Sequence, residues 1–339
     1  MKLKKKLSLS LAVLLGSAML LGACGKEDAN GTANADGNQT VSFKLTHVTQ
    51  PTHIWHRTAE KFNEELQARS DGRMKVDIFP AATLGPEKDM IQQIGAGTID
   101  FGIITNAYMS STAEPFNGWF MPFLFEDLEA ATKARDTEPA KKMLQELDKQ
   151  GIVGMDFILA GNRHILMKDK NIEKVEDLKG QKIRIIGSPA MQDFWHGVGA
   201  GPSPMPLPEV YTSLQTGVID GIDIDLDALN TEKYYEIAKS LTLTNQMTFP
   251  GVVMMNKAKL ESLSAEDQEI VNAAMKAAVD WGMEEAVAGE VKNLDELKGH
   301  GITITELNNP ESFNAIRDEV YEKYSKDPII KEFIEVNQK

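Results

Sequence analysis

The strongest candidate for a functional residue in this sequence is a single arginine within a short apolar run. The run lies in "GQKIRIIGSPAMQDFW" (180–195), where three isoleucines predict a buried strand and Gly-Ser-Pro ends it. Burial of Arg184 in that strand would cost several kcal/mol unless an anion meets it. The anion is either a carboxylate of the chain or a ligand that the protein collects.

Other residues that could do chemistry are less well arranged. His53 and His56 are three apart near an expected helix start, which two zinc ligands could use, but no cysteine joins them. The run "DIDLD" (223–227) alternates carboxylates, yet a calcium loop from its first aspartate would need glycine sixth and glutamate twelfth, where alanine and tyrosine stand. Neither a G-x-S-x-G elbow nor a phosphate-binding Gly-Lys-Ser/Thr loop occurs. The sequence predicts that the protein binds no metal or cofactor and is not an enzyme. A catalytic triad dispersed along the chain is an alternative that sequence does not exclude.

The N-terminus predicts export. Met1–Lys6 carries four lysines, an apolar run of about 15 residues follows, and Leu-Gly-Ala-Cys ends at Cys24. This pattern is a signal peptide over 1–23, too short to span a bilayer with margin, and its end resembles a bacterial lipobox. We expect Cys24 to be lipidated and 24–40 to form a flexible tether to the outer face of the cell membrane. Because Cys24 is the only cysteine, disulfides within the chain are excluded.

The charge balance narrows the class of partner. The chain has 36 Lys and Arg against 50 Asp and Glu, a net charge of −14, and loss of four lysines with the signal makes it −18. An exported chain this acidic is a poor candidate for binding nucleic acid or an anionic membrane surface. The lipid anchor would be its only membrane contact. About 300 residues remain, which is enough for one large or two medium domains.

Alternating helix and strand patterns predict an α/β chain. A strand pattern at 41–48 precedes a helix pattern from Trp55, and a second strand pattern covers 73–80. Ser264 and Asp267 suit a capping box, and about 25 helical residues after them would give roughly 37 Å. Such a helix could brace two lobes.

Two pairs of similar segments within the chain support a fold of two lobes with similar secondary structure. "IQQIGAGTIDFG" (91–102) resembles "YTSLQTGVIDGI" (211–222), each a helix, a glycine and an Ile-Asp strand start. "EDLKGQKIRI" resembles "DELKGHGITI", where a threonine stands in place of Arg184. The element itself therefore does not require an arginine, although Gly-capped helix-to-strand turns are common.

Several stretches, in order along nearly the whole mature chain, resemble one family. The family is the extracytoplasmic solute receptors of TRAP transporters, the tripartite ATP-independent secondary carriers. The stretches are "RMKVDIFPAATLG" (73–85), "GTIDFGI" (97–103), "MPFLFED" (121–127), "EDLKGQKIRIIGSP" (176–189) and "MPLPEVYTSLQTGVIDG" (205–221).

The resemblance implies a two-lobed periplasmic-binding-protein fold, in which a hinge lets the lobes close on a ligand and a long helix spans both. On this basis we expect 41–160 with about 250–289 to form lobe I. Lobe II would comprise 161–249 with about 290–335.

The resemblance also implies which residues bind the ligand. The family clamps a ligand carboxylate with the arginine of the "KIR" strand, here Arg184, and a guanidinium matches a carboxylate bidentately. Arg163 in "AGNRHI" occupies the place of a second family arginine, although a salt bridge between lobes would also explain it. The alternative for Arg184 is a permanent internal salt bridge.

Five further candidate residues follow from the same resemblance. Thr105 or Asn106 would lend a polar side chain after the "GTIDFGI" strand. His47 and His53 would form the opposite wall, and Leu207 would pack a bulky side chain against the ligand.

The sequence departs from the family after "IDG". Many members continue with Gln-Glu-Asn-Pro, whose asparagine helps to bind the carboxylate, whereas this chain has Ile-Asp-Ile-Asp. Asp223 would accept hydrogen bonds from ligand hydroxyls and repel a second ligand carboxylate. We therefore expect a uronate or other sugar acid ahead of a C4-dicarboxylate. Trp195 could supply an apolar face to a sugar ring, although helix packing explains it equally well.

The leading hypothesis is a lipid-anchored receptor that captures an organic acid and delivers it to a TRAP permease in the membrane. An exported enzyme with Arg184 as substrate anchor is the alternative from another class, but no motif supplies its nucleophile. A ligand-presenting partner of a sensor kinase is a third role, compatible with the first.

Overall fold

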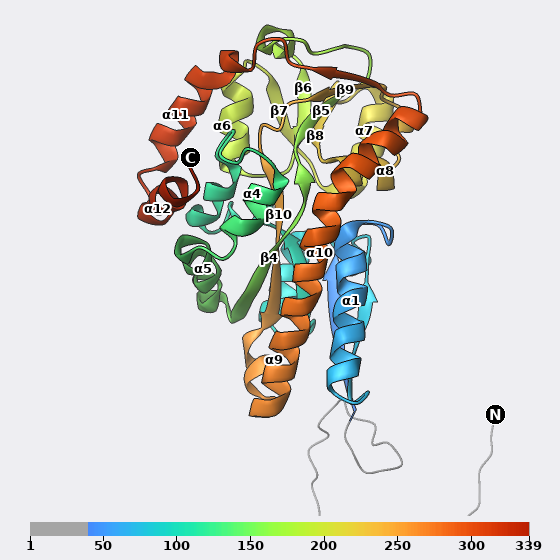
Figure 1. The fold of residues 1–339 in the computed structure, drawn as a ribbon, viewed down its shortest axis with the longest axis vertical. Helices are drawn as coiled ribbons and strands as arrows, with labels where there is room; N and C mark the ends of the chain where they lie inside the picture. The colour runs from blue at the N-terminus through green and yellow to red at the C-terminus, as the bar shows by residue number, and fades with distance from the viewer. Residues whose placement is uncertain (1–39, 339) are drawn as a thin grey trace, which may run out of the picture.

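Two β-sheets, each flanked by helices, make up the described part of the chain. The computed structural model describes residues 40–338. The predicted signal peptide, Cys24 and nearly all of the tether lie outside these residues. Figure 1 shows the two halves one above the other, with the long helix α10 (Ala265–Gly299) running along both.

The first sheet has five strands in the order β2-β1-β3-β10-β4. Its strands are β1 (Val41–His47), β2 (Met74–Phe79), β3 (Phe101–Thr105), β4 (Ile152–Asn162) and β10 (Thr248–Asn256). β1 pairs in parallel with β2 and β3, whereas β10 runs antiparallel to β3 and β4. Because β1 and β3 are parallel, their carboxyl ends lie at the same edge of the sheet.

The second sheet has six strands in the order β11-β9-β5-β8-β6-β7. Its strands are β5 (His164–Met167), β6 (Lys182–Ile185), β7 (Gly201–Pro204), β8 (Gly221–Ile224), β9 (Ser240–Leu243) and β11 (Thr303–Glu306). β6 is parallel to β7 and β8, and Arg184 lies opposite Ser203 and Ile222 in register. The predicted α/β class and two-lobed fold are confirmed.

The helix α10 is longer than the sequence pattern suggested. Ser264 caps it by accepting a hydrogen bond from the backbone N–H of Asp267 at 3.1 Å. Its 35 residues continue through Gly289 and span roughly 52 Å. Gly282 lets it approach α1 (Ile54–Arg69), because a Cβ there would lie 2.3 Å from Oγ1 of Thr58.

The remaining helices connect and cover the sheets. The α-helices are α2 (Glu87–Gly95), α3 (Asn106–Met109), α4 (Leu128–Ala134), α5 (Glu138–Gln145), α6 (Pro189–Gly197), α7 (Leu207–Thr216), α8 (Leu226–Thr231), α9 (Lys257–Glu261), α11 (Asn314–Tyr324) and α12 (Pro328–Asn337). The 3-10 helices are η1 (Glu114–Phe120), η2 (Glu146–Gln150), η3 (Val175–Leu178), η4 (Tyr234–Glu236) and η5 (Pro310–Phe313).

The two C-terminal helices pack on different halves, and α11 lies against α6, which contacts β6 and β7. Residues 290–335 were expected in lobe II, but α12 packs on η1 and α5, beside the first sheet. The Phe333 ring lies 4.9 Å from that of Trp119, and Lys142 pairs with Glu332. Burial of these apolar side chains explains why the chain end returns to the first half.

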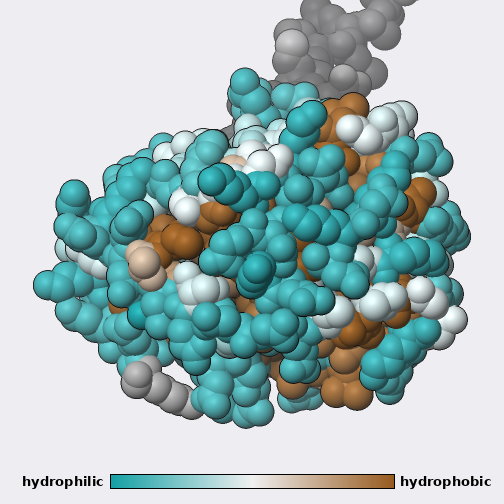
Figure 2. All heavy atoms as spheres, turned by 90° about the horizontal axis from the view of Figure 1, so that it is seen from above, coloured by the Kyte–Doolittle hydropathy of each residue, from teal (hydrophilic) through white to brown (hydrophobic). Residues whose placement is uncertain are grey.

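Polar side chains cover much of the face of the molecule that is seen from above in Figure 2. Figure 2 shows hydrophilic residues over much of one face, with smaller hydrophobic patches between them. In the described residues, no helix combines the length and apolar character needed to cross a membrane.

Candidate ligand-binding cavity

A cavity of about 710 Å³ lies between the two halves. The first half contributes residues after β1, around the start of α2 and at the end of β3, and the second contributes the ends of β6 and β7 and the start of α8. Most of the lining is apolar; its apolar members are Val48, Ala82, Pro86, Ile186, Pro204, Met205, Pro206, Leu207, Pro208, Ile224, Ala228 and Phe249. The volume suits a small organic molecule.

Arg184 lies on this cavity with a donor that the protein leaves free. Its Nε and Nη2 donate to the carbonyl of Met205 at 3.0 and 2.8 Å, which fixes the plane of the guanidinium. Its Nη1 is buried and meets no hydrogen-bond acceptor in residues 40–338. Burial lowers the pKa of Arg184 to about 10, so the group stays charged at neutral pH.

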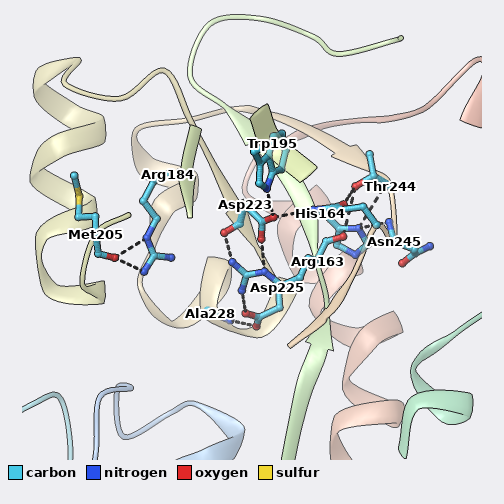
Figure 3. Close-up of polar contacts among 11 residues, drawn as sticks. Arg163, His164, Arg184, Trp195, Met205, Asp223, Asp225, Ala228, Thr244 and Asn245 are labelled. Carbon is cyan, nitrogen blue, oxygen red and sulfur yellow. Dashed lines mark hydrogen bonds and ion pairs between the residues drawn. The ribbon is translucent and has the colours of Figure 1, made fainter. Parts of the chain in front are cut away.

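Arg163, by contrast, is paired from every side (Figure 3). Its Nε contacts a carboxylate oxygen of Asp223, its Nη1 lies 3.1 Å from Oδ2 of Asp225, and its Nη2 donates to the Asp223 carbonyl. The guanidinium carbon also lies 4.7 Å from the centroid of the Phe249 ring. Arg163, which lies between β4 and β5, therefore ties this junction to β8 and to the start of α8, although it also lines the cavity.

The second oxygen of Asp223 is also occupied. The indole N–H of Trp195 donates to it at 3.0 Å and the amide of Gln246 donates at 3.1 Å. Asp223 is fully buried and does not line the cavity, whereas its neighbour Ile224 does. Alternate residues of a strand face opposite sides, so β8 turns Asp223 away from the cavity toward Arg163 and Trp195.

A carboxylate from the first half also lines the cavity. It belongs to Glu87, in the first turn of α2. The backbone N–H and the hydroxyl of Thr105 donate to its two oxygens at 2.6 and 2.9 Å. Burial raises the pKa of Glu87 to about 7, although these two hydrogen bonds and the charge of Arg184 oppose the rise. Glu87 and Arg184 both line the cavity, without a direct ion pair between them.

A strained loop between β2 and α2 positions Glu87. Ala81 and Ala82 both have left-handed backbone conformations, with φ of 53° and 56°, and Gly85 has a φ of 104°. Backbone N–H groups of the two alanines donate to the carbonyls of Thr49 and His47, which fastens the loop to the end of β1. Such strain in non-glycine residues is held where surrounding contacts over-determine it, and often beside a functional site.

Comparison with known proteins decides the family. The bacterial extracellular solute-binding protein family 7 (DctP) matches residues 45–327. The chain belongs to this family. It is therefore an extracytoplasmic TRAP solute receptor, and the family is one of solute-binding proteins rather than enzymes.

Two curated relatives cover most of the receptor. An uncharacterized protein of Haemophilus influenzae is 32% identical over 283 residues, 84% of this chain and 86% of its own. The 2,3-diketo-L-gulonate-binding periplasmic protein YiaO of Escherichia coli is 31% identical over 287 residues, 84% of this chain and 88% of its own.

A solved structure agrees on the fold. The TRAP periplasmic solute-binding protein of Sulfitobacter sp. NAS-14.1, with bound β-D-galacturonate, superposes with a TM-score of 0.81 at 26% identity. The match covers 86% of this chain and 98% of that one.

The receptor's cavity contains some of the residues expected from sequence and not others. Arg184, Arg163, Thr105 and Leu207 line it, the last from the first turn of α7. Thr105 uses both its donors on Glu87, so it orients that carboxylate.

The remaining expected residues lie behind the wall. Asn106 donates to the carbonyl of Phe116, and His53 caps α1 through its Nδ1. His47 bonds His56 and Thr49, each at 3.0 Å, and burial beside two histidines lowers the pKa of His47 to about 3. These side chains support the wall rather than line it.

Asp223 and Trp195, which were expected to contact the ligand, do not line the cavity; Asp223 instead pairs with Arg163 and accepts a hydrogen bond from Trp195. The same pairing explains the "DIDLD" run, whose first two aspartates meet a guanidinium. Among the described residues, no three His, Cys, Asp or Glu side chains form a group suited to a metal ion.

Glu87 is one of the cavity residues that the sequence did not reveal. In "LGPEKDM" it resembles an ordinary acidic residue in the first turn of a helix, where the helix dipole favours it. Only the fold places it on the cavity.

Proposed function

We propose that this receptor binds an organic acid through Arg184 and delivers it to the membrane permease of a TRAP transporter. The observation that supports this most directly is the buried Nη1 of Arg184, a cavity-lining residue: this atom meets no acceptor in residues 40–338. A buried cationic donor without a partner is costly, and a ligand carboxylate removes that cost. A charge-assisted hydrogen bond of this kind contributes roughly 1.5–3 kcal/mol.

A hydroxylated monocarboxylate, such as a uronate or another sugar acid, is favoured over a C4-dicarboxylate. Two relatives support this class: the protein of Sulfitobacter sp. NAS-14.1 has β-D-galacturonate bound, and YiaO is named for 2,3-diketo-L-gulonate. A further solved relative, from Xanthobacter autotrophicus, also contains β-D-galacturonate, at 27% identity and a TM-score of 0.82 over 87% of this chain and 98% of that one. Among the cavity-lining residues that the structure describes, Arg184 alone has a buried cationic donor without an acceptor, which suits one carboxylate.

The lipid anchor on Cys24 is part of the proposal. The lipobox-like end of the apolar run supports it, together with the tether that follows. Labelling cells that express the receptor with a fatty-acid analogue should place the label on the wild type and not on Cys24→Ala. A wild type that is released without label would contradict the anchor and leave the binding proposal intact.

Thermal-shift titration tests the binding. The probes are D-galacturonate, D-glucuronate, 2,3-diketo-L-gulonate and succinate, each added to the wild type and to Arg184→Met. An acid at 100 times its Kd should stabilise the native state by about 2.7 kcal/mol, visible as a rise of several degrees in Tm. The rise should be absent in Arg184→Met. Equal shifts in both proteins would exclude Arg184 as the anchor.

A further inference from the structure

Glu87 is a half-buried carboxylate that lines the cavity and forms no ion pair with residues 40–338. It comes from the first half, at the start of α2, while Arg184 comes from the second half, on β6. Its two oxygens each accept one hydrogen bond from Thr105, at 2.6 and 2.9 Å. A carboxylate can accept about four hydrogen bonds, so acceptor capacity remains for a ligand.

The charged and titratable groups around Glu87 come from several elements. Arg184 on β6 and Tyr108 on α3 interact with it electrostatically, and Asp89 lies on its own helix. The other charged residues lining the cavity are Lys88, Arg163, Asp225 and Glu209. Arg163 and Asp225 pair with each other at 3.1 Å, so they offer Glu87 little net charge.

We propose that Glu87 selects the group a ligand carries at the end remote from its Arg184-bound carboxylate, admitting hydroxyls and rejecting a second carboxylate. This inference rests on the proposed function. It identifies Glu87 as the residue that discriminates between hydroxylated monocarboxylates and dicarboxylates. A hydroxyl donates to Glu87 and gains a charge-assisted hydrogen bond. A second carboxylate can only accept, so it meets Glu87 as a like charge unless one of the two takes up a proton.

The geometry distinguishes this role from a structural one. Thr105 is the only protein donor to Glu87 in the described residues, and glutamine could keep both contacts by accepting from the N–H and donating to the rotated hydroxyl. The strained alanines at 81 and 82 hold α2 so that its first turn reaches the cavity. A purely structural role would therefore be served by the amide, whereas a selective role would not.

Calorimetry with two matched acids tests the proposal. D-galactonate and D-galactarate share one six-carbon hydroxylated skeleton and differ only in whether the far end is a hydroxymethyl group or a carboxylate. At pH 8, wild type should bind galactonate at least about tenfold tighter than galactarate. Glu87→Gln should bring the ratio of the two Kd values to about threefold or less, by weakening galactonate and strengthening galactarate.

Asp89→Asn is the matched control. It removes one negative charge from the first turn of the same helix, at an exposed position outside the cavity lining. The Kd ratio should stay at the wild-type value in this variant. A ratio that changes equally in Asp89→Asn and Glu87→Gln would overturn the proposal, because a general effect of charge would then explain both.

Proton linkage gives a second readout. Galactarate binding to wild type should take up about one proton at pH 8, measured from binding heats in buffers of different ionisation enthalpy, and should tighten as the pH falls below 7. In Glu87→Gln both effects should disappear.

The outcomes separate the two proposals. If neither acid nor any probe acid binds wild type, the proposed function fails. If galactonate binds wild type and not Arg184→Met, yet Glu87→Gln leaves the Kd ratio and proton uptake unchanged, the receptor stands and the role of Glu87 is refuted.

Discussion

Two buried arginines, Arg163 and Arg184, line the same cavity, but their guanidinium groups differ in their hydrogen-bond and ion-pair partners. Arg163 meets carboxylates of Asp223 and Asp225, a backbone carbonyl and an aromatic ring. Arg184 meets one carbonyl, that of Met205, and has a free donor. The guanidinium of Arg163 is therefore fully paired, whereas that of Arg184 keeps one donor for which residues 40–338 supply no acceptor.

The difference shows how burial alone can mislead. Both side chains are at most 2% exposed, so accessibility does not separate a structural arginine from a binding one. The number of unmet donors does separate them, since a buried unmet donor is rare in folded proteins and calls for an explanation. Four changes would break or sharpen this contrast.

Arg163→Met should have the largest effect, on folding. It leaves Asp223 and Asp225 buried without their cation, and removing one partner of a buried pair costs about 3–5 kcal/mol. Urea unfolding would measure the loss as a lower midpoint. A variant as stable as wild type would show that the network is not a stabilising one.

Arg184→Met should weaken binding of an accepted acid about 100-fold, or roughly 2.7 kcal/mol. Its stability without ligand should equal or exceed that of wild type, because it removes a desolvated cation that has no carboxylate partner. Calorimetry and urea unfolding of the same preparation give both numbers. Large destabilisation with intact binding would reverse the roles assigned to the two arginines.

Glu87→Gln should change how stability depends on pH. The folded-state pKa of Glu87 is raised from 4.5 to about 7, so its contribution to stability is full below pH 4.5 and is lost as the pH rises through 7. Relative to wild type, the variant should therefore gain about 1–3 kcal/mol between pH 4.5 and pH 7.5. Other raised carboxyls, those of Asp156 and Glu290, titrate in both proteins and cancel in the difference.

Trp195→Phe should have the smallest effect. It removes one of the donors to Asp223 and keeps the aromatic packing, so stability should fall by about 1 kcal/mol. Ligand affinity should change less than twofold, because Trp195 does not line the cavity. A selective loss of sugar-acid affinity would place the indole against the ligand after all.

The sequence predicted the α/β class, the long helix and the arginine on β6, because each depends on a local pattern. Arg184 stands out in an apolar strand, and Ser264 with Asp267 signals a helix start. The position of the C-terminal helix was harder to predict, because α12 packs on η1 and α5 through contacts that no local pattern encodes.

The cavity itself was predicted only in part. Asp223 and Ile224 alternate along β8, and the sequence does not say which face of the strand meets the cavity. Glu87 reaches the cavity through the loop of Ala81, Ala82 and Gly85, whose left-handed conformations depend on hydrogen bonds to the end of β1. Both facts require the tertiary arrangement.

The carbonyl of Met205 has one further consequence, for the thermodynamics of capture. An arginine side chain has about 2 kcal/mol of rotamer entropy, and two hydrogen bonds to one oxygen remove much of it before any ligand arrives. Binding then immobilises little of the protein at the point of contact. When a flexible side chain is already restrained before binding, an entropic cost of about 0.5–1.5 kcal/mol is avoided. Met205, which donates no hydrogen bond to the ligand, would thus strengthen its binding by keeping Arg184 still.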